Sequence, residues 1–192
     1  MGTYSAEYEA EVTHSALQAA AGDNAALDFF VRSTQADVWR FIAYLGHRST
    51  ADDLTQETFL RAIKSLPRFT AQSTARTWLL SIARRVCADE VRRAMSRPRI
   101  AGTADWVAAA ETRRAQVTPI RWQEIVETKV MIDLLPEDRR EALVLTQILG
   151  LSYQEAADVL GCPIGTVRSR VARAREALVE AASASDERSR SV

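Results

Sequence analysis

The chain has 192 residues and no net charge, because 25 basic side chains balance 25 acidic ones, and 47% of its residues are apolar. This length suits two compact units with a connector, and the composition excludes a disordered chain, a collagen-like fibre and a disulfide-dense scaffold. No apolar run approaches a membrane span, and the acidic N-terminus lacks the apolar core of a secretion signal, so we expect a cytoplasmic protein without membrane insertion. Cys87 and Cys162 lie far apart and outside any metal-binding motif, so we predict reduced thiols, no metal and no cofactor.

Charge is unevenly distributed along the chain. Residues 1–60 carry nine acidic and three basic side chains, residues 76–99 carry seven arginines against two acids, and residues 161–178 carry four arginines against one acid. The two basic clusters would attract a polyanion, and the acidic first part suits a protein partner. Solvated helix faces explain the charge pattern equally well.

Apolar periodicity predicts helices throughout and no strands. After a flexible start at 1–11 we expect helices at 12–21, at 23 or 24–45 up to Gly46, from a cap at Ser49 or Thr50 to just before Pro67, and at 75–95. The pattern weakens over 96–123, which predicts an extended linker. Helices return near 125–134, 137–149, 152–160 and 163–182, and the polar tail at 183–192 is predicted to be disordered. The fold class is therefore all-α, with two small helical domains at 12–95 and 124–182.

Residues 150–178 hold the sharpest local signal. Ser152 and Glu155 match a capping box, Gly161 ends that helix, and Pro163 suits the start of the next. The second helix has one apolar stripe at steps of three and four residues, and arginines line its free face. The pair predicts a helix-turn-helix domain whose second helix enters the major groove of DNA. A solvated amphipathic hairpin is the alternative.

The helix at 75–95 has a predicted buried side that includes Trp78. Its opposite stripe consists of Thr77, Ser81, Arg84, Ala88 and Arg92, with Arg85 beside it. Arginines separated by small residues allow a phosphate backbone to approach. Upstream, Phe69 and the hydroxyl-rich residues 70–74 suit a pocket for an unstacked base. Alternatively, Trp78 is a core residue and the loop only caps the helix.

The helix with the sequence ADDLTQETFLRA, residues 51–62, mixes acidic and apolar side chains. Paired carboxylates can perform acid–base catalysis, but no nucleophile, histidine or metal-binding cluster accompanies them. We therefore expect no enzyme, and we interpret this helix as a surface for a protein partner or as a solvated face.

Three segments in this order resemble the bacterial RNA polymerase sigma factors of the extracytoplasmic-function (ECF) group. They are ADDLTQETFLRA (51–62), STARTWLLSIARRVCADEVRR (73–93) and LSYQEAADVLGCPIGTVRSRVARARE (151–176). The resemblance implies that the chain binds core RNA polymerase, directs it to specific promoters and promotes DNA opening. It also implies sigma domain 2 at 12–95, a linker through the polymerase cleft and sigma domain 4 at 124–182.

The resemblance further implies roles for particular residues. Docking on the clamp helices of the polymerase β′ subunit would use Asp52, Asp53, Gln56, Glu57 and Phe59. The promoter −10 element would be bound by Phe69, Ser73, Trp78, Ser81, Arg84, Arg85 and Arg92. The −35 element would be read by Thr166, Arg168, Ser169, Arg170 and Arg173. The β flap is the second expected polymerase contact, and an inhibitory anti-sigma factor is a hypothesis from the same resemblance.

Two other classes of protein fit parts of the pattern. A free-standing helix-turn-helix regulator would bind duplex operators without polymerase, but it requires neither the acidic helix nor the arginine-striped helix. A helical adaptor that binds only proteins would leave the arginines of the predicted recognition helix, among them Arg168 and Arg173, without a role.

Overall fold

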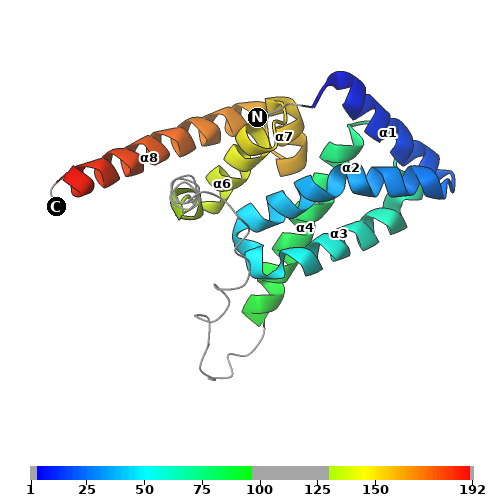
Figure 1. Cartoon of the computed structure of the whole chain (residues 1–192), viewed down its shortest axis with the longest axis horizontal. Coiled ribbons are helices and arrows are strands. Elements are labelled where there is room, and N and C mark those ends of the chain that lie inside the picture. The colour runs from blue at the N-terminus through cyan, green and yellow to red at the C-terminus, as the bar shows by residue number, and fades with distance from the viewer. Residues whose placement is uncertain (1–3, 97–129, 191–192) are drawn as a thin grey trace.

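The computed structural model describes residues 4–96 and 130–190, which are largely helical and contain no strand, so the predicted all-α class is confirmed (Figure 1). The N-terminal unit consists of α1 (Ala6–Ala20), α2 (Asn24–Ile42), α3 (Ala51–Ser65) and α4 (Ala75–Ser96). The C-terminal unit contains α6 (Glu137–Leu143), α7 (Tyr153–Leu160) and α8 (Ile164–Arg190). The predicted linker, from residue 97 on, and most of the predicted helix at 125–134 lie outside the described residues.

The core of the N-terminal unit forms around α2. Phe30, Phe41 and Ile42 on α2 are fully buried, as is Leu79 on α4. Phe59 on α3 meets the ring of Phe30 edge to face, with 6.5 Å between the ring centroids. Burial of these large side chains is the main stabilising contribution to the unit.

The ends of three helices differ from the predictions. α1 begins at Ala6, within the predicted flexible start, because the Ser5 hydroxyl accepts a hydrogen bond from the Tyr8 amide at 3.2 Å. Thr50 precedes α3, but its side chain does not cap the helix. α8 continues to Arg190, into the tail at 183–192 that the sequence predicts to be disordered. At the start of this extension the Ser183 hydroxyl donates to the Val179 carbonyl at 3.0 Å.

The predicted helix-turn-helix is present in the C-terminal unit. Ser152 and Glu155 form the capping box of α7, and Gly161 ends it with a left-handed φ of 64°. Val167, Val171 and Ala174 form the buried stripe of α8, each no more than 1% exposed. Beyond the turn, α8 projects away from the rest of the chain (Figure 1).

The two units touch through α4 and α7. Arg76 on α4 donates a hydrogen bond from Nη2 to the Leu149 carbonyl, which precedes α7, at 2.6 Å. None of the helices within 4–96 and 130–190 combines the length and hydrophobicity needed to cross a bilayer.

Ser152→Ala should lower the free energy of unfolding by about 1 kcal/mol, because the Glu155 amide loses its capping oxygen. Urea denaturation followed by circular dichroism measures this. Ser152→Thr keeps the oxygen and should behave like the wild type, and an unchanged stability in Ser152→Ala would contradict the assigned cap.

Candidate nucleic-acid and polymerase interfaces

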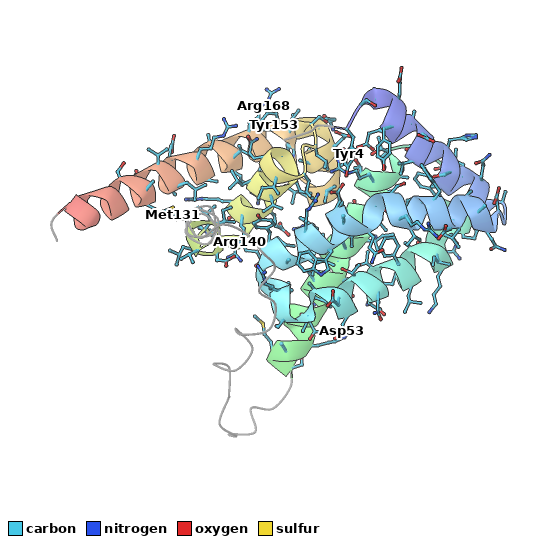
Figure 2. The ribbon with its side chains drawn as sticks, in the orientation of Figure 1. Tyr4, Asp53, Met131, Arg140, Tyr153 and Arg168 are labelled. Atoms are coloured by element: carbon cyan, nitrogen blue, oxygen red, sulfur yellow. The ribbon has the colours of Figure 1, made fainter. Side chains whose placement is uncertain are left out.

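The free face of α8 presents two arginines to solvent. Arg168 and Arg173 are both exposed, and within the described part of the chain neither has a hydrogen-bond or ion-pair partner. Figure 2 shows Arg168 pointing away from the body of the molecule. Because the opposite stripe of α8 is buried, the helix holds both guanidinium groups outward, available to a polyanion.

The other predicted residues of α8 are engaged within the chain. Arg170 is about one-quarter exposed, and its Nε forms an ion pair with Asp138 Oδ2 at 3.1 Å, which ties α8 to α6. The Ser169 hydroxyl donates to the Thr166 carbonyl, one turn earlier, at 2.9 Å. Among the arginines of α8 predicted to read the −35 element, Arg168 and Arg173 are therefore the ones whose side chains are not engaged by other described residues.

The loop before α4 is held by an aromatic pair at its first residue. The rings of Phe69 and Trp78 lie 4.9 Å apart between centroids, with Phe69 buried and Trp78 half-buried. Ser73 is half-buried, and Ala71 has a φ of 54°. A left-handed backbone costs a residue with a Cβ about 1–2 kcal/mol, so the contacts around the loop must hold Ala71 in this shape.

The arginines predicted to face DNA on α4 have unequal surroundings. Arg85 is exposed, Arg92 is exposed but paired with Asp89, and the half-buried Arg84 donates from Nε to Glu141 Oε1 of α6 at 2.8 Å. The half-buried Ser81 bonds to the Thr77 carbonyl. The prediction that Thr77 belongs to an exposed stripe is wrong, because Thr77 is 1% exposed in the first turn of α4, where its side chain and amide bond to the Thr74 hydroxyl.

Burial next to α6 changes the acidity of two groups. Burial raises the pKa of Glu141, and the hydrogen bond from Arg84 offsets this only in part. Burial, with a smaller contribution from Glu141, raises the pKa of the Cys87 thiol to about 12. Cys87 and Cys162 are both free thiols, and Cys87 stays protonated and unreactive.

Arg76 lies in the interior, although its sequence position places it in the basic cluster. Its Nε bonds to Asp37 Oδ2 at 2.6 Å, its Nη1 to Glu9 Oε1 at 3.2 Å, and its guanidinium lies 4.7 Å from the centre of the Tyr4 ring. Charge counting does not separate such a buried arginine from one that faces DNA. A sequence signal exists in Asp37, a lone acid on the apolar side of α2.

Helix α3 presents one mixed stripe to solvent. Asp53, Gln56, Leu60 and Ile63 recur at steps of three and four residues and are all exposed, and the apolar members are 55% and 41% exposed respectively. We predicted the two polar members of this stripe, Asp53 and Gln56, but missed Leu60 and Ile63, which the helical period alone would have found.

The remaining predicted docking residues of α3 are engaged within the chain or buried. Asp52 Oδ1 accepts a hydrogen bond from Trp39 Nε1 at 2.9 Å, and Glu57 pairs with Arg61 at 2.8 Å. Phe59, also predicted to dock on polymerase, has its ring buried against Phe30 in the core of the free chain. Among the described residues no cluster of histidine, cysteine or carboxylate side chains suits a metal ion.

Comparison with known protein families identifies the two units. Residues 30–97 match the family model of Sigma-70 region 2, and residues 126–178 match that of Sigma-70, region 4. The N-terminal unit thus contains Sigma-70 region 2, and the C-terminal unit contains Sigma-70 region 4.

The chain also has close relatives among whole proteins. It is 53% identical over 185 residues to the ECF RNA polymerase sigma factor SigC of Mycobacterium tuberculosis, and the match covers 96% of this chain and 98% of that protein. It is 39% identical over 137 residues to EcfG of Rhodopseudomonas palustris, covering 71% and 74% respectively. The chain therefore belongs to the ECF sigma factors of RNA polymerase. As such it binds core polymerase, directs it to specific promoters and promotes DNA opening.

Solved structures agree with this assignment. CnrH in complex with the cytosolic domain of CnrY superposes with a TM-score of 0.70 at 27% identity, over 91% of this chain and 98% of that one. RpoE of Bartonella quintana in complex with the anti-sigma factor NepR gives a TM-score of 0.63 at 26% identity, over 82% and 96% respectively.

The raised pKa of Glu141 predicts a measurable linkage between pH and stability. The folded state binds this proton more readily than the unfolded state, so the contribution of Glu141 to the free energy of unfolding rises as pH falls from neutrality toward 4.5, its ordinary value. Over this range the wild type should gain stability relative to Glu141→Gln in urea titrations. Glu180→Gln, at an exposed glutamate, should follow the wild type, and a relative loss in the wild type would show that the Arg84 ion pair dominates.

Proposed function

We propose that this ECF sigma factor acts through three separate surfaces, one that binds core polymerase and two that bind the −10 and −35 elements of the promoter. It catalyses no reaction itself and acts in the cytoplasm with core polymerase. The observation that carries the proposal is the exposed pair Arg168 and Arg173 on a helix whose other side is buried in a helix-turn-helix. In Figure 2 Arg168 and Asp53 lie on opposite sides of the molecule, so the proposed −35 and polymerase surfaces do not overlap in the free chain.

At the −35 element α8 would enter the major groove. An arginine can pair in bidentate fashion with O6 and N7 of guanine, and such a contact contributes about 1–3 kcal/mol of discrimination. Arg168 and Arg173 are the side chains free to do this. The bonded Ser169 and the paired Arg170 would hold the shape of the helix.

At the −10 element the chain would hold bases that have left the duplex. Unstacking a base costs a few kcal/mol, and stacking or hydrogen bonding in a pocket returns about 1–3 kcal/mol per base. The loop at 69–74 presents hydroxyl groups for this purpose, and the Phe69–Trp78 pair fixes its first residue. Arg85 and Arg92 would contact the phosphate backbone.

On polymerase the two units would separate. Arg84 is held by Glu141 of the other unit, so its interaction with DNA requires that this ion pair be released. Two weak DNA-binding units held on one polymerase frame then gain affinity through their effective concentration. We therefore expect weak, salt-sensitive DNA binding by the isolated chain and specific binding in the holoenzyme.

A second proposed partner is an anti-sigma factor. Bartonella quintana RpoE, which shares the fold of this chain, was solved with the anti-sigma factor NepR. A regulator of this kind would act by blocking the polymerase or promoter surfaces described above.

Arg173→Ala should reduce transcription from a cognate promoter about 5- to 150-fold in reactions with core polymerase, because one guanine contact is lost. Promoters altered only at −35 should be affected less, since their contact is already missing. Glu176→Ala, on the same exposed face, is the matched control. Unchanged promoter selectivity in Arg173→Ala would favour the protein-binding adaptor, and tight specific binding of duplex DNA without polymerase would favour the free-standing regulator.

Leu60→Glu should weaken binding to core polymerase about tenfold, because the exposed apolar stripe of α3 would lose a buried leucine at the interface. Pull-down of titrated core polymerase by the tagged chain measures the affinity. Leu17→Glu, at an exposed leucine of α1, should bind like the wild type. Equal affinity of both variants would place the docking surface elsewhere.

A further inference from the structure

The first turn of α4 depends on a hydrogen bond from a distant helix. The first amides of a helix have no partner inside it, so each needs an acceptor from elsewhere. Thr74 supplies one locally, because its hydroxyl oxygen accepts from the Thr77 amide at 3.2 Å. The amide of Ala75 instead donates to Thr13 Oγ1 on α1 at 3.1 Å, 62 positions away in the chain.

The Thr13 hydroxyl is held in the orientation that this contact needs. It donates its own proton to the Glu9 carbonyl, one turn earlier on α1, at 2.8 Å. Its oxygen is therefore left as an acceptor for the Ala75 amide. Glu9 reinforces the contact, because its side chain pairs with Arg76, the next residue of α4, at 3.2 Å.

Helix α1 also lies beside the loop that precedes α4. A pocket of about 620 Å³ is lined by Thr13 and His14 of α1 and by Ala71, Ser73 and Thr74 of the loop. The loop is thus held at its first residue by the Phe69–Trp78 rings, and α1 holds Ala75, the residue that directly follows the loop. Between these two anchors lies Ala71 with its left-handed backbone.

We propose that α1 positions the −10 recognition loop, residues 69–74, and that the hydroxyl of Thr13 is the group on α1 that maintains the shape of this loop. This inference rests on the proposed role of residues 69–74 in −10 binding. It extends the −10 site to a helix that precedes residue 30, where the match to Sigma-70 region 2 begins. Thr13 is a positioning residue, since it acts through Ala75 and Thr74 and not by contact with DNA.

The test is transcription by core polymerase with the full chain, on promoters that differ only at −10 or only at −35. Thr13→Val removes the acceptor at nearly constant volume, so we expect discrimination among −10 variants to fall about three- to tenfold. Discrimination among −35 variants should stay as in the wild type. Thr13→Ser restores the hydroxyl and should restore −10 discrimination.

Thr34→Val is the matched control for a general loss of stability. Thr34 is buried in α2, and its hydroxyl donates to the Phe30 carbonyl at 2.7 Å, as the Thr13 hydroxyl donates to the Glu9 carbonyl within α1, but no hydrogen bond joins Thr34 to the loop among the described residues. This variant should keep −10 discrimination even where its melting temperature falls as far as that of Thr13→Val. If Thr13→Val does not fold at the assay temperature, Thr13→Ala removes the same acceptor without adding a methyl group.

The outcomes of this test distinguish the inference from the proposed function. If the wild type discriminates at −10, Trp78→Ala loses that discrimination and Thr13→Val keeps it, the inference about α1 is wrong and the role of the loop stands. If the wild type does not discriminate at −10, both fail. A uniform loss of transcription across all promoters in Thr13→Val, without rescue by Thr13→Ser, also overturns the positioning role.

Discussion

A buried guanidinium is tolerated in a protein when ionic and hydrogen-bond partners replace the water it has lost. Arg76 meets this requirement through Asp37, Glu9 and the Leu149 carbonyl, so each of its three nitrogens has a partner. Those partners come from α2, from α1 and from the segment before α7. One side chain therefore fixes the start of α4 relative to α1, α2 and the segment before α7, and this also sets the position of the loop that leads into α4.

Arginines of this chain differ in whether an acidic side chain pairs with them, and this difference separates a structural role from a binding role. Arg76, Arg84 and Arg170 have acidic partners and join helices to one another. Arg168 and Arg173 have no such partners within the described residues, and they keep their full attraction for a polyanion. A sigma factor with a balanced net charge can therefore still present a cationic surface, because Arg168 and Arg173 are left without an acidic partner within the described residues while other arginines are paired.

The −10 loop illustrates how a binding site is prepared before its ligand arrives. Anchors at both ends hold the loop, including the unfavourable backbone of Ala71, so less ordering remains for the moment when DNA binds. In the free chain the neighbouring Arg84 is occupied by Glu141 of the other unit. The proposed release of this ion pair on polymerase would separate two units whose contact lies close to the proposed −10 site.

The sequence by itself determined the helical class, the capping box at Ser152, the Gly161 turn and the buried stripe of α8, because these features depend on local backbone geometry and on a short period. The same local rules placed the acids of α3 on its surface and would have found Leu60. The tertiary structure alone decided that Phe59 and Thr77 are buried, that Arg76 is internal and that Thr13 caps α4. These outcomes depend on which helices meet, and residues 13 and 75 lie too far apart in the chain for any local pattern to reveal their contact.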